Sequence, residues 1–489
     1  MEENSAKTIA KNVSFLMGSQ LVTWILTLAV TIFLPRYLGP ESIGKLHLAS
    51  SLWSIGTILV TFGMDIYLVK EIARKPERLS ELFSLSLIIR AGLFLVSYIA
   101  MAIFANVIGY PNETVQVIYV IGISFLANEF VQICAACLQG LEEMGQISLA
   151  NIIGKLFYTI VAIAALVLGF DVITIATILI LANLINAAVQ FRGLRKIHPL
   201  KFSVDFSQVP SILKESTPYM LSNLFAAAYI SIDMVVISLL IKDEAQLGWY
   251  GGADSLFGTM MFVPTVFITA IFPALSRMYS EESESLPQFI SKSFNLLLLL
   301  SIPIGLGMFA ISDSLVVLLY GEEFAGSGPI LAVLSIVLLL TYQNTLLGRY
   351  LISIDLQNTW TRVMAVATVA TIPLDILLIP WAQANLGNGA IGGALAYIFT
   401  EGGMLAAGLY LLPRGYLGRE NLIVAIKGFF CGLVMGAAAW YLRDYFIAIP
   451  IAVSAIIYPA LILMTRAIPQ EDMEILQDTL QPILKRLGR

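Results

Sequence analysis

The chain has 489 residues, of which 58% are hydrophobic and 12% are charged, and its formal net charge is −5. A soluble chain carries about twice that share of charged residues, and the mean hydropathy here is +0.85. The composition therefore excludes a soluble enzyme or a nucleic-acid-binding domain, and it predicts that lipid surrounds most of the chain.

Apolar segments long enough to cross a membrane recur along the whole chain. A spanning helix needs about 20 mostly apolar residues. Fourteen such segments occur, at approximately 13–34, 46–69, 82–106, 115–138, 147–169, 172–190, 218–241, 255–275, 294–319, 329–351, 363–381, 390–412, 422–441 and 445–464. We expect them to be helices, because lipid offers the backbone no other hydrogen-bonding partner. The predicted fold is an all-α integral membrane protein with about 14 transmembrane helices.

The distribution of basic residues predicts the orientation. The first apolar segment is too long for the core of a signal peptide and no cleavage site follows it, so we interpret it as a retained span. With the N-terminus inside, the four basic residues in outer loops are Arg36, Lys45, Lys242 and Arg443. Arg90 lies within a span, and the other 23 of the 28 Lys and Arg residues face the cytoplasm. This asymmetry predicts a multi-pass protein of the plasma (inner) membrane with both termini in the cytoplasm.

Two glycine patterns imitate nucleotide-binding loops. Gly39 to Lys45 has the spacing G-x-x-x-x-G-K, and Gly387, Gly389 and Gly392 match G-x-G-x-x-G. A true P-loop follows a strand and ends in Ser or Thr, whereas Leu46 comes next here and both stretches lie in outer loops. We therefore predict no nucleotide site. We interpret the second pattern as a small-residue helix face that lets a neighbouring helix approach closely.

Cysteine and histidine are too few and too scattered for a metal centre. Cys134, Cys137 and Cys431 lie inside apolar runs, and His47 and His198 are far apart. This spacing fits neither a disulfide framework nor a zinc site. We expect packing roles for the cysteines, and no metal ion or cofactor.

A stretch early in the chain is repeated 204 residues later. "SIGKLHLASSLW" (42–53) aligns with "QLGWYGGADSLF" (246–257), so that Gly44 matches Gly248 and Trp53 matches Phe257. The first span overlays the seventh at the same offset. This predicts a duplicated six-span unit whose copies are related by an axis along the membrane normal, with a cavity between them.

The duplication predicts the domain organisation. Two six-helix lobes are separated by a basic cytoplasmic linker, and two further spans and an amphipathic tail follow the second lobe. The predicted ranges are 1–190 for the N-terminal lobe, 191–217 for the linker, 218–412 for the C-terminal lobe, 413–464 for the extra pair of spans and 465–489 for the cytoplasmic tail.

Four motifs in order carry a resemblance to a known family. They are "PRYLGPESIGKLHLASSL", "LGWYGGADSL" with "IFPALSR", "LLYGEEFAGSGPILAVLSIVLL" and "IPLDILLIPWAQANLGNGAIGGALAYI". The chain resembles the polysaccharide-transport (Wzx-like oligosaccharide flippase) branch of the multidrug/oligosaccharidyl-lipid/polysaccharide exporter superfamily over nearly its whole length. It departs from the family pattern at Ile43, where an aromatic residue is usual, and at Asp375, where Asn is common.

The resemblance implies a transporter. Such a protein moves a polyprenyl-(pyro)phosphate-linked oligosaccharide, or a related polysaccharide precursor, from the cytoplasmic to the outer leaflet by alternating access. In this family the two helices after the twelfth are implicated in accommodating the lipid tail. The implied partners are the lipid-linked oligosaccharide, membrane lipids, H⁺ or Na⁺ as a coupling ion, and polysaccharide assembly enzymes, with no nucleotide and no nucleic acid.

Two other functions fit part of the pattern. A multidrug-type cation antiporter of the same superfamily would be favoured by twelve spans and a mainly acidic cavity. A membrane glycan polymerase or ligase would typically need a sizeable outer loop with basic and His residues, whereas the outer loops here are short. We therefore expect a transporter and not an enzyme, with no catalytic residues.

Basic residues deep in the spans are candidate contacts for the substrate phosphate. Ionisable groups there are costly and mark candidate functional sites. Arg90 and Lys155 each lie about two turns inside the cytoplasmic surface. Arg can donate two parallel hydrogen bonds to a phosphate, and Lys can act as a point charge. The alternative is that Arg90 pairs with a carboxylate such as Glu129 on the adjacent span.

Acidic and amide side chains within the spans complete the candidate site. Glu129 and Asp233 lie near the middle of their spans, where each could line a polar cavity or be a buried structural partner. With Gln20 and Asn223 they are candidates for substrate binding. The candidates for ion coupling are Glu129, Asp233, Asp375 and Glu401.

Overall fold

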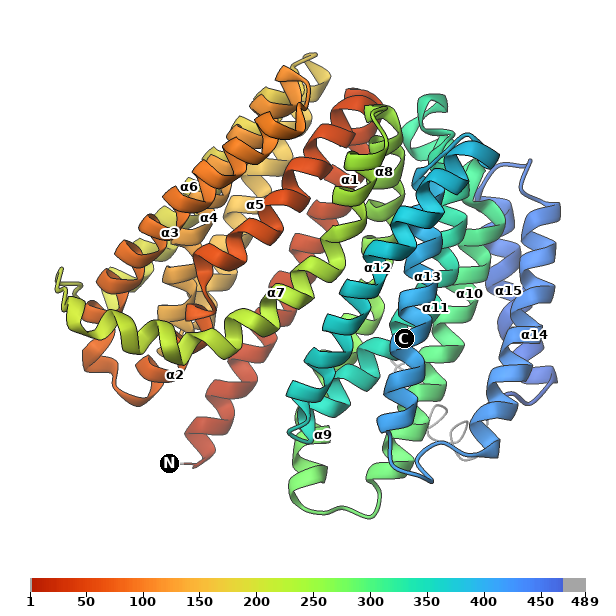
Figure 1. The fold of residues 1–489 in the computed structure, drawn as a ribbon. Coiled ribbons are helices and arrows are strands. Elements are labelled where there is room, and N and C mark those ends of the chain that lie inside the picture. The colour runs from red at the N-terminus through yellow and green to blue at the C-terminus, as the bar shows by residue number, and fades with distance from the viewer. Residues whose placement is uncertain (1, 469–489) are drawn as a thin grey trace, which may run out of the picture. The chain divides into compact units, whose positions relative to one another are not determined.

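The computed structural model describes residues 2–468, with side chains from residue 18 onward, and it is built of helices (Figure 1). Contacts between residues divide the chain into two compact units, Met1–Gly252 and Ala253–Arg489. Unit 1 contains α1 (Glu2–Thr61), α2 (Met64–Arg74), α3 (Leu79–Ile108), α4 (Asn112–Gly140), α5 (Met144–Val167), α6 (Val172–Ile197) and α7 (Val209–Leu240).

Helix α8 (Glu244–Met260) begins in unit 1 and ends in unit 2. Unit 2 then contains α9 (Phe262–Ser280), α10 (Leu286–Tyr320), α11 (Ser327–Ser353), α12 (Gln357–Leu386), α13 (Ala390–Leu411), α14 (Arg419–Tyr441) and α15 (Ala448–Met464). Three short 3₁₀ helices lie in the connections, at Pro76–Arg78, Phe206–Gln208 and Glu322–Phe324.

All fourteen predicted segments fall on helices. Within the described residues, 12 helices are long and apolar enough to cross a membrane. The first of them contains two predicted spans, because α1 continues through a kink at Gly39 (φ 75°, ψ 169°) where the chain turns between them. The fourteenth span is α15, which has only 17 residues. The predicted fold class, an all-α multi-pass membrane protein, is therefore confirmed.

The same pattern of helix pairs recurs in the two units. In unit 1, α4 packs against α2, α3 and α6, and α5 packs against α6. In unit 2, α11 packs against α9, α10 and α13, and α12 packs against α13. These are the pairs expected when one six-span unit is copied along the chain. The recurrence supports the duplication inferred from the sequence.

Unit 1 extends beyond the predicted first lobe, because α7 packs against α1 and α2. The segment before α7 is also anchored to the start of α3. The backbone N–H groups of Lys201 and Ser203 donate to the hydroxyls of Ser80 and Ser84, at 3.2 and 3.3 Å. The basic linker is therefore packed against the first six-span copy.

Close packing accounts for several of the small or apolar residues singled out in the sequence. Cys134 and Cys137 are buried in the apolar core around α2, α3 and α4, as predicted. At Gly392 an added Cβ would lie 2.4 Å from the carbonyl oxygen of Leu378, so the second glycine pattern does bring α12 and α13 together.

The pair α14 and α15 lies side by side in Figure 1 and packs against α10. An added Cβ at Gly432 would lie 2.3 Å from Ile302, and the hydroxyl of Tyr458 donates to the carbonyl of Leu299 at 3.0 Å. Most of the predicted amphipathic tail, from residue 469 onward, lies outside the described residues.

Candidate functional site

The second predicted span is broken at Phe62 and Gly63, between α1 and α2. Both residues have left-handed backbone conformations, with φ of 49° and 70°. Only glycine fits at position 63, because an added Cβ would lie 2.5 Å from the backbone nitrogen of Met220 on α7. For Phe62, which is not a glycine, the left-handed conformation costs on the order of 1–3 kcal/mol. Broken helices occur inside membranes only where the freed backbone groups are buried in protein or line a water-filled cavity.

A buried ion-pair network lies directly beside this break. Arg90 on α3 is 2% exposed, and its Nη1 lies 2.9 Å from Oε2 of Glu129 on α4. Its Nη2 contacts Oδ1 of Asp65, which is in the first turn of α2. Thr61, the last residue of α1, donates its hydroxyl to Oε1 of Glu129 at 3.0 Å. The network thus connects both sides of the helix break to α3 and α4.

This arrangement occupies the guanidinium of Arg90. Two nitrogens of its planar fork contact carboxylates, and the third, Nε, is buried without an acceptor. The sequence left open whether Arg90 contacts substrate or pairs with Glu129, and the pairing is what the geometry shows. One positive charge faces two carboxylates, and the carboxylate of Asp65 is the more exposed of the two, at 35% against 5% for Glu129.

Lys155 on α5 is in a different situation. Its side chain is partly buried, and its Nζ lies 5.8 Å from the centre of the Tyr158 ring. Within the part of the chain that the structure describes, it makes no ion pair. Lys155 is therefore the candidate basic group whose charge is not committed to a carboxylate. Of the two predicted amides, Gln20 on α1 is exposed and Asn223 on α7 is half-buried.

The remaining predicted acids are buried in separate places. Asp233 on α7 is 3% exposed and accepts a hydrogen bond from the hydroxyl of Tyr250 at 3.1 Å. In unit 2, the carboxylate of Glu401 on α13 accepts a hydrogen bond of 2.5 Å from the side-chain amide of Asn344 on α11. Asp375 is fully buried on the neighbouring helix α12. Among the described residues, no group of three His, Cys, Asp or Glu side chains is placed to hold a metal ion.

The two repeated sequence stretches meet in unit 1, on the side predicted to be outer. Gly44 and Gly248, which align in the repeat, lie against one another. An added Cβ at Gly44 would be 2.8 Å from the nitrogen of Gly248, and one at Gly248 would be 1.8 Å from the carbonyl oxygen of Pro40. His47 contacts Gly251 at the same offset of 204 residues.

A salt bridge reinforces this meeting point. Lys45 is 6% exposed, and its Nζ lies 2.8 Å from Glu113 at the start of α4 and 3.3 Å from Glu244 at the start of α8. Thr114 donates its hydroxyl to Glu244. The lysine of the P-loop-like pattern therefore joins three helices, and the glycine before it provides close helix contact.

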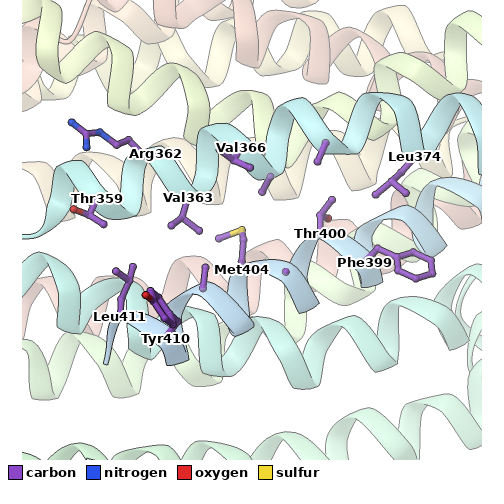
Figure 2. Close-up of a pocket in the computed structure, with 14 residues that line it drawn as sticks. Thr359, Arg362, Val363, Val366, Leu374, Phe399, Thr400, Met404, Tyr410 and Leu411 are labelled. Carbon is purple, nitrogen blue, oxygen red and sulfur yellow. The ribbon is translucent and has the colours of Figure 1, made fainter. Parts of the chain in front are cut away.

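Two apolar grooves lie in unit 2. The larger, about 690 Å³, is formed by α10, α14 and α15 and includes Leu300, Pro303, Met435, Ala455 and Ile462. The second, about 450 Å³, lies between α12 and α13, and Figure 2 shows side chains of both helices, including Val363 and Met404, facing it. Arg362 lies at one end of this second groove.

Sequence reasoning did not identify all of the polar contacts. Asp65 is not among the candidate site residues predicted from the sequence, yet it binds Arg90 beside the helix break. From the sequence, Lys45 is a basic residue of an outer loop within the P-loop-like pattern, and neither feature predicts its salt bridges. The available signal for Asp65 was its position two residues after a glycine that interrupts an apolar span, since broken helices often line ion or substrate sites.

Residues 9–279 match the family model described as "Polysaccharide biosynthesis protein", which is more than half of the chain. The chain belongs to this family. The chain is thus a member of the polysaccharide-transport branch of the multidrug/oligosaccharidyl-lipid/polysaccharide exporter superfamily, as the four sequence motifs suggested.

One relative of this chain is the probable low-salt glycan biosynthesis flippase Agl15 of Haloferax volcanii. The two are 24% identical over 74% of this chain and 75% of the relative. The lipid II flippase MurJ, in an inward closed conformation, has the same fold with a TM-score of 0.75 and 16% identity, over 93% of this chain and 99% of that one.

A multidrug MATE transporter in an inward-facing conformation has a similar fold. Its TM-score is 0.62 at 17% identity, over 86% of this chain and 96% of that one. The fold is therefore shared by glycan-precursor flippases and multidrug transporters, and the family membership decides between the two classes: this chain is a flippase-type transporter for glycan precursors.

Proposed function

We propose that this protein moves a polyprenyl-(pyro)phosphate-linked oligosaccharide, or a related polysaccharide precursor, from the cytoplasmic to the outer leaflet by alternating access. The observation that carries the proposal is the groove of about 690 Å³ between α10, α14 and α15. A polyprenyl chain must stay in apolar surroundings while its head group crosses, and each buried CH₂ contributes about 0.8 kcal/mol. A small drug cation has no such tail.

The head group is the physical obstacle. Moving an isolated charge into a low-dielectric medium costs tens of kcal/mol by Born estimates, and the sugars add polar groups. A polar path through the protein that opens to one side at a time removes this barrier. An inside-negative membrane potential favours outward movement of an anion by about 2.3 kcal/mol per charge per 100 mV. H⁺ or Na⁺ coupling through buried acids such as Asp375 and Glu401 would add to this drive.

Lys155 is the residue that we assign to the substrate phosphate. The guanidinium of Arg90 is already bound by two carboxylates, so it would have to exchange partners before it could bind a phosphate. The ammonium of Lys155 lies over an aromatic ring and can turn to a phosphate at no such cost. We propose that Glu129 and Asp233 act as structural partners, and that Gln20 and Asn223 are the amides available to sugars.

A transporting role also fits the connections on the predicted outer side. They are short throughout the described part of the chain, with ranges 109–111, 168–171, 241–243, 321–326, 387–389 and 442–447 between helices. A glycan polymerase or ligase would need a larger outer region to hold two glycans. We therefore propose that the protein transports the precursor and that separate enzymes assemble it.

The function is tested in proteoliposomes that contain tritiated polyprenyl diphosphate carrying one N-acetylglucosamine. We expect the purified protein to bring the sugar to the opposite leaflet, where a lectin captures it. Lys155→Gln should lower the rate about tenfold or more, because a hydrogen bond to a charged group contributes about 1.5–3 kcal/mol. Lys155→Arg should retain activity.

Lys201→Gln, a change at an exposed lysine of the linker, serves as the control and should leave the rate unchanged. Normal transport by Lys155→Gln would remove Lys155 from the site. A wild-type protein that moves ethidium but no lipid-linked sugar would overturn the flippase proposal in favour of a multidrug antiporter.

The direction of transport depends on the orientation, which labelling can establish. In a chain whose three native cysteines are replaced, we expect single cysteines at Asn112 and Asp444, both exposed, to react in intact cells with an impermeant maleimide. A cysteine at the exposed Ser207 should react only after the cells are opened. Labelling of position 207 in intact cells would reverse the orientation and the proposed direction.

A further inference from the structure

Helices α1 and α5 pack against one another, and each carries a stripe of residues on one side that includes part of this contact. On α5 the stripe is Asn151, Lys155, Tyr158, Ala162 and Ala165, and on α1 it is Gln20, Thr23, Thr27, Val30 and Leu34. The spacing of three and four residues places each set on one side of its helix. In the half that contains Val30 and Ala162 the stripes pack together as an apolar core cluster. We call the two stripes the α1–α5 seam.

The other half of the seam, toward the predicted cytoplasmic side, is polar and accessible. Gln20 and Asn151 are exposed there, and Thr23, Thr27 and Lys155 are partly buried. The threonine hydroxyls donate to carbonyls of their own helix at 2.9 Å, so their oxygens remain free to accept. The seam thus changes from close apolar packing to an open polar surface within about three helical turns.

The exposure of Asn151 is not toward lipid. The lipid-facing side of α5 carries the exposed apolar residues Leu149, Ile153, Leu156 and Ile160. Successive helical residues are rotated by about 100°, so Asn151 lies about half a turn away from Leu149 and Ile153. Its amide is therefore accessible on the side of α5 that faces α1.

A chain of amide hydrogen bonds holds Asn151 in place. Gln190 on α6 donates its Nε2 to Oδ1 of Asn186 at 2.9 Å, and Asn186 donates its Nδ2 to Oδ1 of Asn151 at 3.1 Å. Gln190 is 1% exposed and its Oε1 has no partner. Gly154 permits the approach of α6, because an added Cβ there would lie 3.0 Å from Cβ of Asn186. These hydrogen bonds use the Oδ1 of Asn151, so its Nδ2 remains available as a donor.

We propose that the polar half of the α1–α5 seam is a head-group subsite in which Asn151 recognises the first sugar while Lys155 holds the adjacent phosphate. The inference rests on the proposed function and extends it to sugar recognition. Gln20 offers a second amide from the opposite helix, and the threonine oxygens can accept from sugar hydroxyls. Asn186 and Gln190 do not touch the sugar; they are positioning residues that fix the amide of Asn151.

The test compares two probes in the same proteoliposomes. One is tritiated polyprenyl diphosphate carrying N-acetylglucosamine, detected by lectin capture, and the other is bare polyprenyl diphosphate, detected by phosphate release to external alkaline phosphatase. Asn151→Ala should lower the rate for the sugar probe about tenfold, as expected for loss of one hydrogen bond to the substrate, and leave the bare probe unchanged. Gln190→Leu should also lower the ratio of the sugar-probe rate to the bare-probe rate. Lys155→Gln should lower both rates.

Asn183→Ala is the matched control. Asn183 is also an amide on α6, but it donates to Ser124 on α4 and lies outside the seam, so its loss should leave the ratio unchanged. A ratio that stays at the wild-type value in Asn151→Ala and Gln190→Leu, while the wild type moves both probes, would overturn the subsite and leave the proposed function standing. If the wild type moves neither probe, the proposed function itself fails.

Discussion

Replacing Arg90 with Gln is expected to lower the free energy of unfolding by about 3–5 kcal/mol, because removal of one partner from a buried ion pair leaves an uncompensated charge. In this chain the charges left behind are the carboxylates of Glu129 and Asp65. The change can be measured by denaturant titration in detergent micelles, with thermal melting as a second measure.

The double variant Arg90→Gln with Glu129→Gln should recover most of the loss, because it also removes the charge of the more buried carboxylate: Glu129 is 5% exposed and Asp65 is 35% exposed. Arg74→Gln is the control: Arg74 also lies near an acidic side chain, 3.9 Å from Glu71, but it is 64% exposed, and a surface pair contributes about 0–1 kcal/mol. A stable Arg90→Gln protein that no longer transports would contradict the structural role and return Arg90 to the phosphate site.

Replacing Gly248 with Ala is expected to destabilise the protein by about 3 kcal/mol, the upper part of the usual range for overpacking. The added methyl group would lie 1.8 Å from the carbonyl oxygen of Pro40 and 2.4 Å from its carbonyl carbon. Both atoms are backbone atoms, so no side-chain rotation can make room. The salt bridges of Lys45 to Glu113 and Glu244 lie within the same contact and would be strained with it. Thermal melting in detergent measures the change.

Gly258→Ala provides the matched comparison, because Gly258 is on the same helix and an added Cβ there meets no atom within 4 Å. That change should be neutral or stabilise the helix by up to about 1 kcal/mol, since Ala is the better helix former. Equal melting temperatures for the two variants would show that α1 and α8 do not approach as closely as described.

The helices and their order could be predicted from the sequence, because lipid leaves the backbone few options. A run of about 20 apolar residues in a membrane must satisfy its own hydrogen bonds, and only a helix does so within one segment. The repeat was visible for a similar reason: small residues such as Gly44 and Gly248 are needed wherever two helices approach closely, and their spacing is kept in both copies. The core position of Cys134 and Cys137 also follows from local composition alone.

Contacts across the chain could be decided only by the tertiary structure. The sequence showed that Arg90 and Glu129 were unusual in their spans, and it offered both substrate binding and mutual pairing. The pairing could be recognised only from the distance between Arg90 on α3 and Glu129 on α4. Asp65 joins the pair because the helix breaks at Phe62 and Gly63, which places Asp65, in the first turn of α2, against Arg90. Likewise, Asn151 is unremarkable in sequence; its placement depends on Asn186 and Gln190, which lie 35 or more residues away and reach it only when α6 packs against α5. Apolar patterning is a property of each segment and its solvent, whereas the partner of a buried polar group is chosen by which helices pack together, and that choice is made by the whole fold.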